Sequence, residues 1–203
     1  MIIDCVLTAC NSNNIYSSLI PMFIQAWNIL FPEIDVKIIY IDDNIPDNLK
    51  NYEKNLILYN PHDNISTAFI SQYIRLLYPA LLNYKNGVLI TDVDIIPLCR
   101  SFYLKYSKDY DNNTFVHFSP SIIQNQIIMC YNLASPIVWS KVCNISCIED
   151  INKRLNNVYY SIKYTDGHGK DGWTKDQEDL YHYLNNYCGK KVLLNNLKVK
   201  SYN

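Results

Sequence analysis

The stretch Gly87-Val88-Leu89-Ile90-Thr91-Asp92-Val93-Asp94 joins an apolar run directly to two acidic residues. The run Gly87 to Thr91 is aliphatic and rich in β-formers, which predicts a strand buried on both faces. Asp92 and Asp94 follow at alternate positions, so in extended chain both carboxylates would face one side and Val93 the other. Ligands of open α/β sheets bind beyond the carboxyl ends of the strands, so this stretch predicts a binding site at that edge.

Two carboxylates at a strand end suit a hard divalent cation. Mg²⁺ and Mn²⁺ commonly take one or two carboxylates together with phosphate oxygens. We therefore expect Asp92 and Asp94 to hold Mn²⁺ or Mg²⁺; the alternative is that they only cap a turn before Pro97. A second acidic pair, Asp109 and Asp111, lies in a polar stretch and is interpreted as part of a solvent-exposed loop.

Working outward from this stretch, strand-like and helix-like patterns alternate through the first half of the chain. Apolar runs predict further buried strands at Ile2 to Thr8, Val36 to Ile41 and Leu56 to Tyr59. Helical patterns cover Ile15 to Phe31 and about Ser66 to Leu82, where Pro79 is expected to kink or end the helix. Such alternation predicts an α/β fold, a three-layer sandwich around a mostly parallel sheet.

The second half is less regular. Its expected strands are Phe115 to Phe118, Ile127 to Tyr131 and Val192 to Leu194, and its expected helices are Ser135 to Val142, Ile148 to Leu155 and Lys175 to Tyr187. Tyr164 to Trp173 holds three of the five glycines and is expected to be an irregular loop. With 203 residues and neither linker nor repeat, we expect one domain over 1–203.

Composition excludes several classes of function. Eighteen basic residues nearly balance nineteen acidic ones, so an extended nucleic-acid surface is not expected. Pro21, Gln25 and Asn28 interrupt the most apolar helical stretch, so we expect no membrane span. The N-terminus has no secretory pattern, and none of the seven cysteines are spaced C-x-x-C. We therefore expect reduced, mostly buried thiols in a cytoplasmic protein.

Several segments also resemble a known family. Arg75 to Leu82 followed by Gly87 to Pro97 looks like the helix-strand-DxD segment of GT-A glycosyltransferases, which have a Rossmann-like fold. Ile127 to Asn132, with Trp139 downstream, resembles small GT-A domains of large DNA viruses, such as the first domain of the chlorella virus rhamnosyltransferase. Trp173 to Leu180 is similar to the Asp-Gln segment of glycogenin-like enzymes. A viral origin would place the protein in the host cytoplasm.

This resemblance implies a nucleotide-sugar donor, such as a UDP-sugar, and a glycan or glycoprotein acceptor. It places uridine near the end of the first strand, at Thr8, Ala9 and Asn11, and Arg75 near the diphosphate or the acidic pair. It also implies that Asp94 binds the metal directly, and that Asp92 binds it directly or through the ribose or a water.

Residues 1–100 would then be the nucleotide-sugar-binding half and 101–203 the acceptor-binding half. A histidine that often supplies the third metal ligand is missing from its usual place, since His182 falls inside an expected helix and His168 precedes the Asp-Gln segment.

Sugar transfer must stabilise charge on the leaving diphosphate and on an oxocarbenium-like sugar. Arg75 suits the first task, and the alternative is a solvent-facing or core-edge arginine on an amphipathic helix. Asp176 is the candidate carboxylate for the second task. The alternative is that it is simply an acidic residue in the first turn of a helix, where the helix dipole favours an ionised carboxylate. Gln177 is a candidate donor-binding residue, but Thr174-x-x-Gln177 also matches a capping box.

Other candidates remain open. Trp173 would stack on a sugar ring or anchor the following helix, and the glycine-rich loop before it has the composition of a lid. His117 on an apolar strand is interpreted as a core histidine. The rival functions are a non-catalytic module that binds nucleotide sugars or glycans, and a sugar nucleotidyltransferase. The latter usually carries a glycine-rich basic loop after its first strand, which Ala9 to Asn14 lacks.

Overall fold

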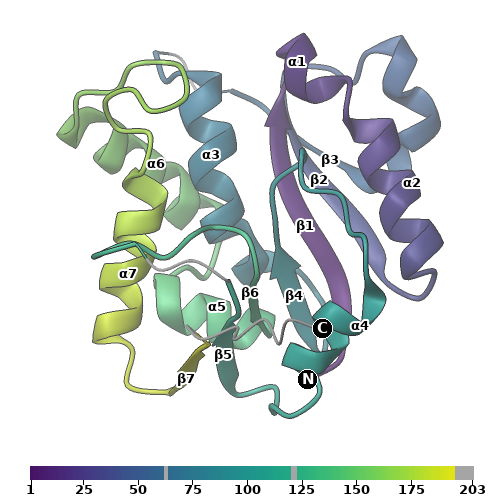
Figure 1. Ribbon diagram of the computed structural model, residues 1–203. Helices are drawn as coiled ribbons and strands as arrows, with labels where there is room; N and C mark the ends of the chain where they lie inside the picture. Colours follow the sequence, from purple (N-terminus) through teal and green to yellow (C-terminus); the bar gives the residue numbers. More distant parts are fainter. Residues whose placement is uncertain (62–63, 120–122, 195–203) are drawn as a thin grey trace, which may run out of the picture.

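The computed structural model describes residues 1–61, 64–119 and 123–194. One sheet of seven strands runs through this part of the chain, in the order β3-β2-β1-β4-β6-β5-β7 (Figure 1). The strands are β1 Ile3–Asn11, β2 Asp35–Ile41, β3 Leu56–Tyr59, β4 Gly87–Ile90, β5 Thr114–His117, β6 Asn132–Ala134 and β7 Lys190–Leu193. β6 pairs antiparallel with β4 and β5, and the remaining strand pairs are parallel. The predicted mostly parallel sheet is therefore confirmed.

Helices cover both faces of this sheet. The helices are α1 Asn14–Ser17, α2 Ile20–Leu30, α3 Thr67–Leu77, α4 Arg100–Ser107, α5 Pro136–Cys143, α6 Ile148–Ser161 and α7 Lys175–Asn186, with 3-10 helices η1 Asp47–Asn55 and η2 Tyr78–Leu81. One core joins the sheet to α3, α5, α6 and α7 and is built around residues such as Phe69 and Trp139. The second joins the opposite face to α2, α4 and η1 and includes Trp27 and Tyr103. The expected three layers are confirmed.

The first half of the chain follows its pattern closely, because most residues of its strands are buried, with Leu58 of β3 an exception at 40% exposure. β3 has the predicted bounds, and β1 is longer than predicted, since it continues to Asn11. The helix expected to reach Leu82 ends at Leu77 instead, and the chain continues as η2 with Pro79 in its first turn. Pro79 lacks the N–H that an α-helix would need there, so the predicted effect of this proline is confirmed.

The second half contains two corrections. The strand predicted at Ile127 to Tyr131 is wrong, because the chain there is irregular and β6 begins only at Asn132. Tyr131 has a left-handed backbone with φ of 68°, and the Asn132 side-chain amide donates hydrogen bonds to the carbonyls of Ile128 and Met129. A left-handed residue breaks the extended conformation a strand needs. The helix α4 was not predicted at all.

His117 on β5 is a core histidine, as predicted. It is buried, and its Nδ1 lies 2.7 Å from the side-chain oxygen of Asn132, to which it donates. Burial lowers the pKa of the His117 imidazole, so the ring is held neutral. All seven cysteines are free thiols, and four of them are buried. Within the described ranges, no helix has the length and apolar character needed to span a membrane.

Candidate active site

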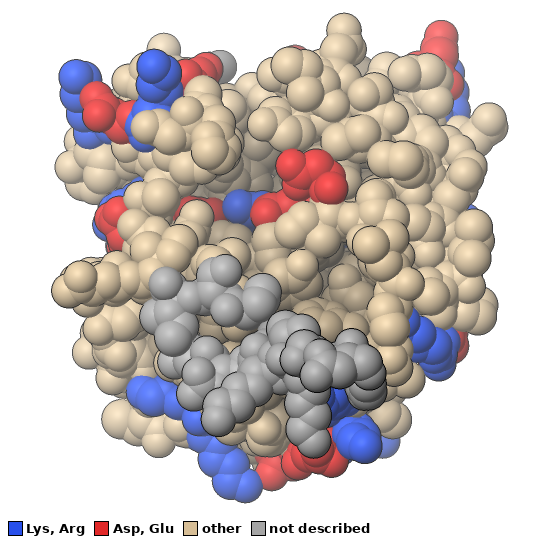
Figure 2. Space-filling model, in the orientation of Figure 1, with Lys and Arg blue, Asp and Glu red and all other residues tan. Residues whose placement is uncertain are grey.

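A cavity of about 310 Å³ opens at the carboxyl ends of β1 and β4. Its walls come from the end of β1, α1, one face of α3, the turn after β4, the loop 164–173 and the start of α7. Figure 2 shows this face of the molecule hollowed near its centre, where acidic and basic atoms meet in a largely uncharged surround. This is the edge of the sheet at which the sequence predicts a site.

The acidic pair lies in the turn that follows β4. The turn is fixed by hydrogen bonds from the Thr91 N–H to the Leu7 carbonyl, 3.1 Å, and from the Ile95 N–H to the Asp92 carbonyl, 3.1 Å. Asp92 and Asp94 both line the cavity, and Val93 between them also contributes to its lining although it is buried in the core on the α2 face. The two carboxylates thus share one space as expected, although a turn rather than strand alternation places them there.

Arg75 connects this turn to α7. Its guanidinium forms an ion pair with Asp92 and a second one with Asp176, at 3.2 Å between Nη2 and Oδ2. The Arg75 Nε also donates to the Gln72 carbonyl at 3.0 Å, and only 13% of the side chain is exposed. Of the alternative, a solvent-facing or core-edge arginine, the solvent-facing form is therefore wrong. Arg75 lies beside the acidic pair, which is the second of the two places that the resemblance implies.

Asp176 is the second residue of α7, and its side chain is only 2% exposed. It accepts from Arg75 and from the backbone N–H of Gln177, at 2.9 Å, and it is not among the residues that line the cavity. Burial raises the pKa of the Asp176 carboxyl, and Arg75 opposes that rise. Desolvation thus acts against the ionisation that the helix start was expected to favour, and the ion pair with Arg75 acts in favour of it.

Gln177 does line the cavity. The capping box proposed as its alternative role is wrong, because no side chain caps α7 and the Thr174 hydroxyl donates to Glu178 at 2.7 Å instead. The Gln177 carboxamide is therefore not engaged in capping its own helix.

At the other end of the cavity lies the end of β1. Ala9 and Asn11 line the space, and the Asn11 side-chain amide donates to the Thr67 hydroxyl at 3.1 Å. Thr8 does not line the cavity, since its side chain is 0% exposed within the sheet. Of the three residues predicted to lie near uridine, the structure thus brings two to the cavity.

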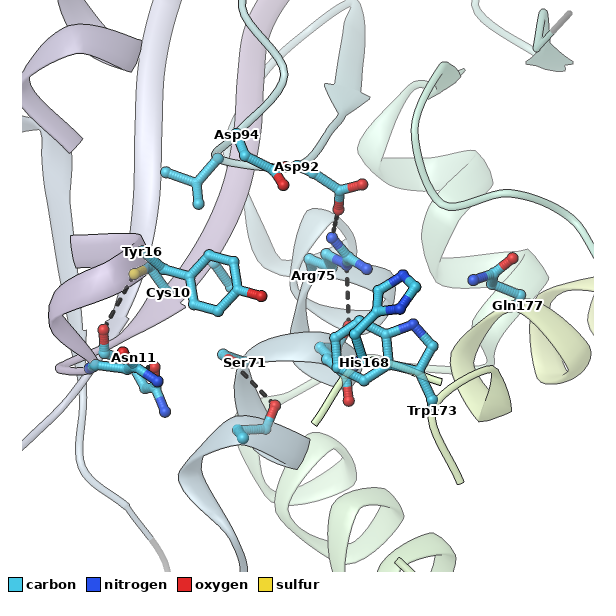
Figure 3. A pocket seen from close by; sticks show the side chains of 15 residues that line it. Cys10, Asn11, Tyr16, Ser71, Arg75, Asp92, Asp94, His168, Trp173 and Gln177 are labelled. Atoms are coloured by element: carbon cyan, nitrogen blue, oxygen red, sulfur yellow. Dashed lines mark hydrogen bonds and ion pairs between the residues drawn. The ribbon is translucent and has the colours of Figure 1, made fainter. Parts of the chain in front are cut away.

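The sequence did not indicate two neighbours of these residues. Tyr16 in α1 lines the cavity opposite the loop 164–173 (Figure 3). The Cys130 thiol is buried and donates to Asp92 Oδ2 at 2.6 Å, and burial raises its pKa to about 11, so it remains a protonated donor. An aromatic residue shortly after the first strand is a signal that would have found Tyr16. Cys130 lies within the irregular segment that precedes β6 and had no such signal.

The carboxylates of this cavity suit a divalent cation that takes its remaining ligands from the phosphates of a bound substrate. No group of three His, Cys, Asp or Glu side chains able to hold a metal occurs among the residues that the structure describes. His182 lies on α7 away from the cavity, whereas His168 lines it. Asp94 is exposed in the cavity, and the described ion pairs give it no basic partner. Two carboxylates with phosphate oxygens satisfy Mg²⁺ or Mn²⁺ without a third protein ligand.

Comparisons with solved structures give the fold. No protein-family model and no curated protein matches the chain. The glycosyltransferase GlyE of Streptococcus pneumoniae TIGR4 aligns with a TM-score of 0.55 at 15% identity, over 95% of this chain and 45% of that chain. The galactosyltransferase LgtC, solved with donor and acceptor sugar analogues, aligns with a TM-score of 0.50 at 14% identity, over 89% of this chain and 70% of that chain.

The chain thus spans less than half the length of GlyE and about seven-tenths of that of LgtC. With its seven-stranded, mostly parallel sheet between two layers of helices, this chain has the α/β fold of GT-A glycosyltransferase structures.

Proposed function

We propose that this chain is a metal-dependent glycosyltransferase that moves a sugar from a nucleotide diphosphate, a UDP-sugar, to a hydroxyl of a glycan. The observation that carries the proposal is the meeting of Asp92, Asp94 and Arg75 in one cavity at the carboxyl ends of β1 and β4. Carboxylates for a cation and a guanidinium for phosphate are the groups that a diphosphate leaving group requires.

The centre of the cavity is assigned to the diphosphate. Asp94 and Asp92 would hold Mn²⁺ or Mg²⁺, which when bound stabilises negative charge on the departing diphosphate as a Lewis acid. Arg75 is oriented by Asp176 and Asp92 from two sides, so that its planar guanidinium is fixed before any ligand arrives. Asp176 acts here by positioning Arg75, because Arg75 separates it from the cavity.

The two ends of the cavity are assigned to the two parts of the donor. Asn11, Ala9 and Tyr16 supply an amide, backbone and a flat aromatic face, which suit a uridine. Gln177 lies beyond Arg75 at the other end, where its carboxamide suits the hydroxyls of the donor sugar (Figure 3). The residues assigned to the nucleotide and the cation lie in the proposed nucleotide-sugar half at about 1–100, whereas Gln177 lies in the proposed acceptor half at about 101–203, of which 195–203 lie outside the described residues.

Binding of the donor is tested by thermal shift. We expect a UDP-sugar to raise the melting temperature in the presence of Mn²⁺ and not without it, with GDP- and dTDP-sugars as comparisons. Asp94→Asn should abolish the metal-dependent rise in melting temperature, because the exposed Asp94 carboxylate is proposed as a ligand of the cation. Asp109→Asn is the matched control, since Asp109 belongs to the chain's other Asp-x-Asp and lies outside this cavity.

Activity separates the proposal from its rivals. Slow hydrolysis of the UDP-sugar to UDP and free sugar, dependent on Mn²⁺ and lost in Asp94→Asn, would distinguish a transferase from a binding module. Release of pyrophosphate from a nucleoside triphosphate and a sugar phosphate would identify a nucleotidyltransferase instead. Absence of a metal-dependent shift with every nucleotide would contradict the proposal.

A further inference from the structure

Two aromatic rings from the loop 164–173 line the cavity, and in the view of Figure 3 they lie between Arg75 and Gln177. The rings of His168 and Trp173 both line the cavity, with centroids 5.0 Å apart and planes inclined by 55°. Figure 3 shows them side by side, across the cavity from Tyr16. Neither ring is needed for the nucleotide, the metal or the diphosphate as assigned above.

The loop that carries these rings is hydrogen-bonded to α3 and within itself. The Asp166 carboxylate accepts from the Ser66 hydroxyl at 2.6 Å, and the Tyr164 hydroxyl donates to the Gln72 side chain at 2.9 Å, which fixes the loop to α3. Within the loop, the Thr165 N–H donates to the Asp171 carbonyl at 3.0 Å. The two rings are therefore held in place before a ligand binds, which lowers the entropic cost of binding.

Glycines give the loop its shape. Gly167, Gly169 and Gly172 have φ of 120°, 72° and 80°, in the left-handed region that side chains disfavour. At Gly172, an added Cβ would also lie 3.0 Å from the Tyr164 ring. The turns at these positions bring His168 and Trp173 to the same end of the cavity. The backbone N–H of Trp173 also donates to the Lys170 carbonyl.

The chemistry of this end suits a sugar ring. A pyranose has apolar C–H faces and a rim of hydroxyls, so it packs on a flat aromatic ring while its edge takes hydrogen bonds. Trp173 offers the face, and the His168 imidazole offers a polar edge. The charged lining residues, Arg75, Asp92 and Asp94, are assigned above to the diphosphate and the cation, and Trp173 itself is uncharged. A neutral carbohydrate fits here better than a phosphate or a carboxylate.

We propose that His168 and Trp173 form the subsite for a hexopyranose ring of the acceptor. This inference rests on the proposed function, because it needs a donor in the neighbouring part of the cavity. The donor's own sugar is bonded to the diphosphate and stays beside Arg75 and Gln177. His168 is exposed and Trp173 is half-buried, so this end opens to solvent, from which an acceptor arrives.

The three tryptophans allow a direct test. Trp27 and Trp139 are both 0% exposed, so acrylamide reaches Trp173 before either of them. We expect methyl glycosides of glucose, galactose, mannose and rhamnose, screened one at a time with UDP and Mn²⁺, to include at least one that protects the fluorescence from quenching. Trp173→Phe should remove the quenchable emission and confirm the assignment of the signal.

Affinity for the protecting glycoside is then measured by titration calorimetry. Trp173→Ala should weaken it about tenfold, the effect of losing roughly 1.4 kcal/mol of ring contact, while Trp173→Phe retains most of it. Tyr160→Ala is the control, because Tyr160 is an exposed aromatic of α6 outside the cavity. UDP affinity should be the same in Trp173→Ala as in the wild type.

Three outcomes would overturn the assignment to the acceptor. Protection by UDP alone would place the nucleoside on these rings, and protection by a UDP-hexose but by neither UDP nor any glycoside would place the donor's own sugar there. If no glycoside protects Trp173 while UDP and Mn²⁺ still raise the melting temperature, the subsite is wrong and the proposed function stands. If nucleotide and metal have no effect, the proposed function fails separately.

Discussion

At the scale of single residues, Arg75 carries the charge balance of the site. It is the cation for both Asp92 and Asp176, and two of these three side chains are largely buried. Removing one partner of a buried ion pair leaves an uncompensated charge. We expect Arg75→Ala to lower the free energy of unfolding by about 3 kcal/mol, measured by urea denaturation.

A double-mutant cycle checks this explanation. Asp176→Asn in the Arg75→Ala background should recover part of the lost stability, because a neutral amide needs no cation. Arg75→Lys should be intermediate, since an ammonium lacks the planar fork that reaches two carboxylates at once. If the double variant is as unstable as the sum of the two single variants, the pairing does not stabilise the fold.

At the scale of elements, the start of α6 depends on one carboxylate. Asp150 Oδ2 accepts from the Ser146 N–H at 2.8 Å, the Ser146 hydroxyl at 2.7 Å and the Cys147 N–H at 3.2 Å. These hydrogen bonds lower the pKa of Asp150 from 3.8 to about 2. Because the pKa is lower in the folded chain, the stabilisation is complete above about pH 4 and is lost as the pH falls through 2.

We therefore expect Asp150→Asn to unfold at lower urea concentration than the wild type at neutral pH, with a difference that shrinks toward pH 2. Glu149→Gln removes the same charge from the same turn but none of these hydrogen bonds, so its smaller effect is the control. An NMR titration that places the Asp150 midpoint at 3.8 or above would contradict the assignment.

At the scale of the whole molecule, the two cores lie on opposite faces of one sheet, and each contains a buried tryptophan. Trp27 reports on the face covered by α2, and Trp139 on the face covered by α5. If residues 1–203 form one domain as proposed, both faces should unfold together. In a Trp173→Phe background, Trp27→Phe leaves Trp139 as the one tryptophan, and Trp139→Phe leaves Trp27. For each variant, the urea transition followed by tryptophan fluorescence should superimpose on the one followed by far-UV circular dichroism. Separate transitions would indicate two domains.

Sequence patterns anticipated the parts of the fold where burial alone decides the structure. β2, β3 and β4 are apolar on both faces, so their runs marked them within one or two residues. β6 was misplaced because its start depends on the left-handed Tyr131 and the side-chain hydrogen bonds of Asn132, which no periodicity encodes.

The site was anticipated to a similar extent. Asp92 and Asp94 were found because they immediately follow a buried strand, so the strand itself located them. The burial of Asp176 beneath Arg75 and the contact from Cys130 join residues far apart in the chain, and only the packed structure shows them.

The antiparallel insertion of β6 has a consequence for protein synthesis. β1 to β4 all precede residue 91, whereas β5, β6 and β7 follow residue 113. Because the ribosome releases the N-terminal part first, the parallel half of the sheet emerges while the rest is still being translated. Until β6 arrives, β4 is an open edge of the nascent sheet. Its side chains are all apolar, and its unpaired backbone N–H and C=O groups form a site at which two growing chains can pair.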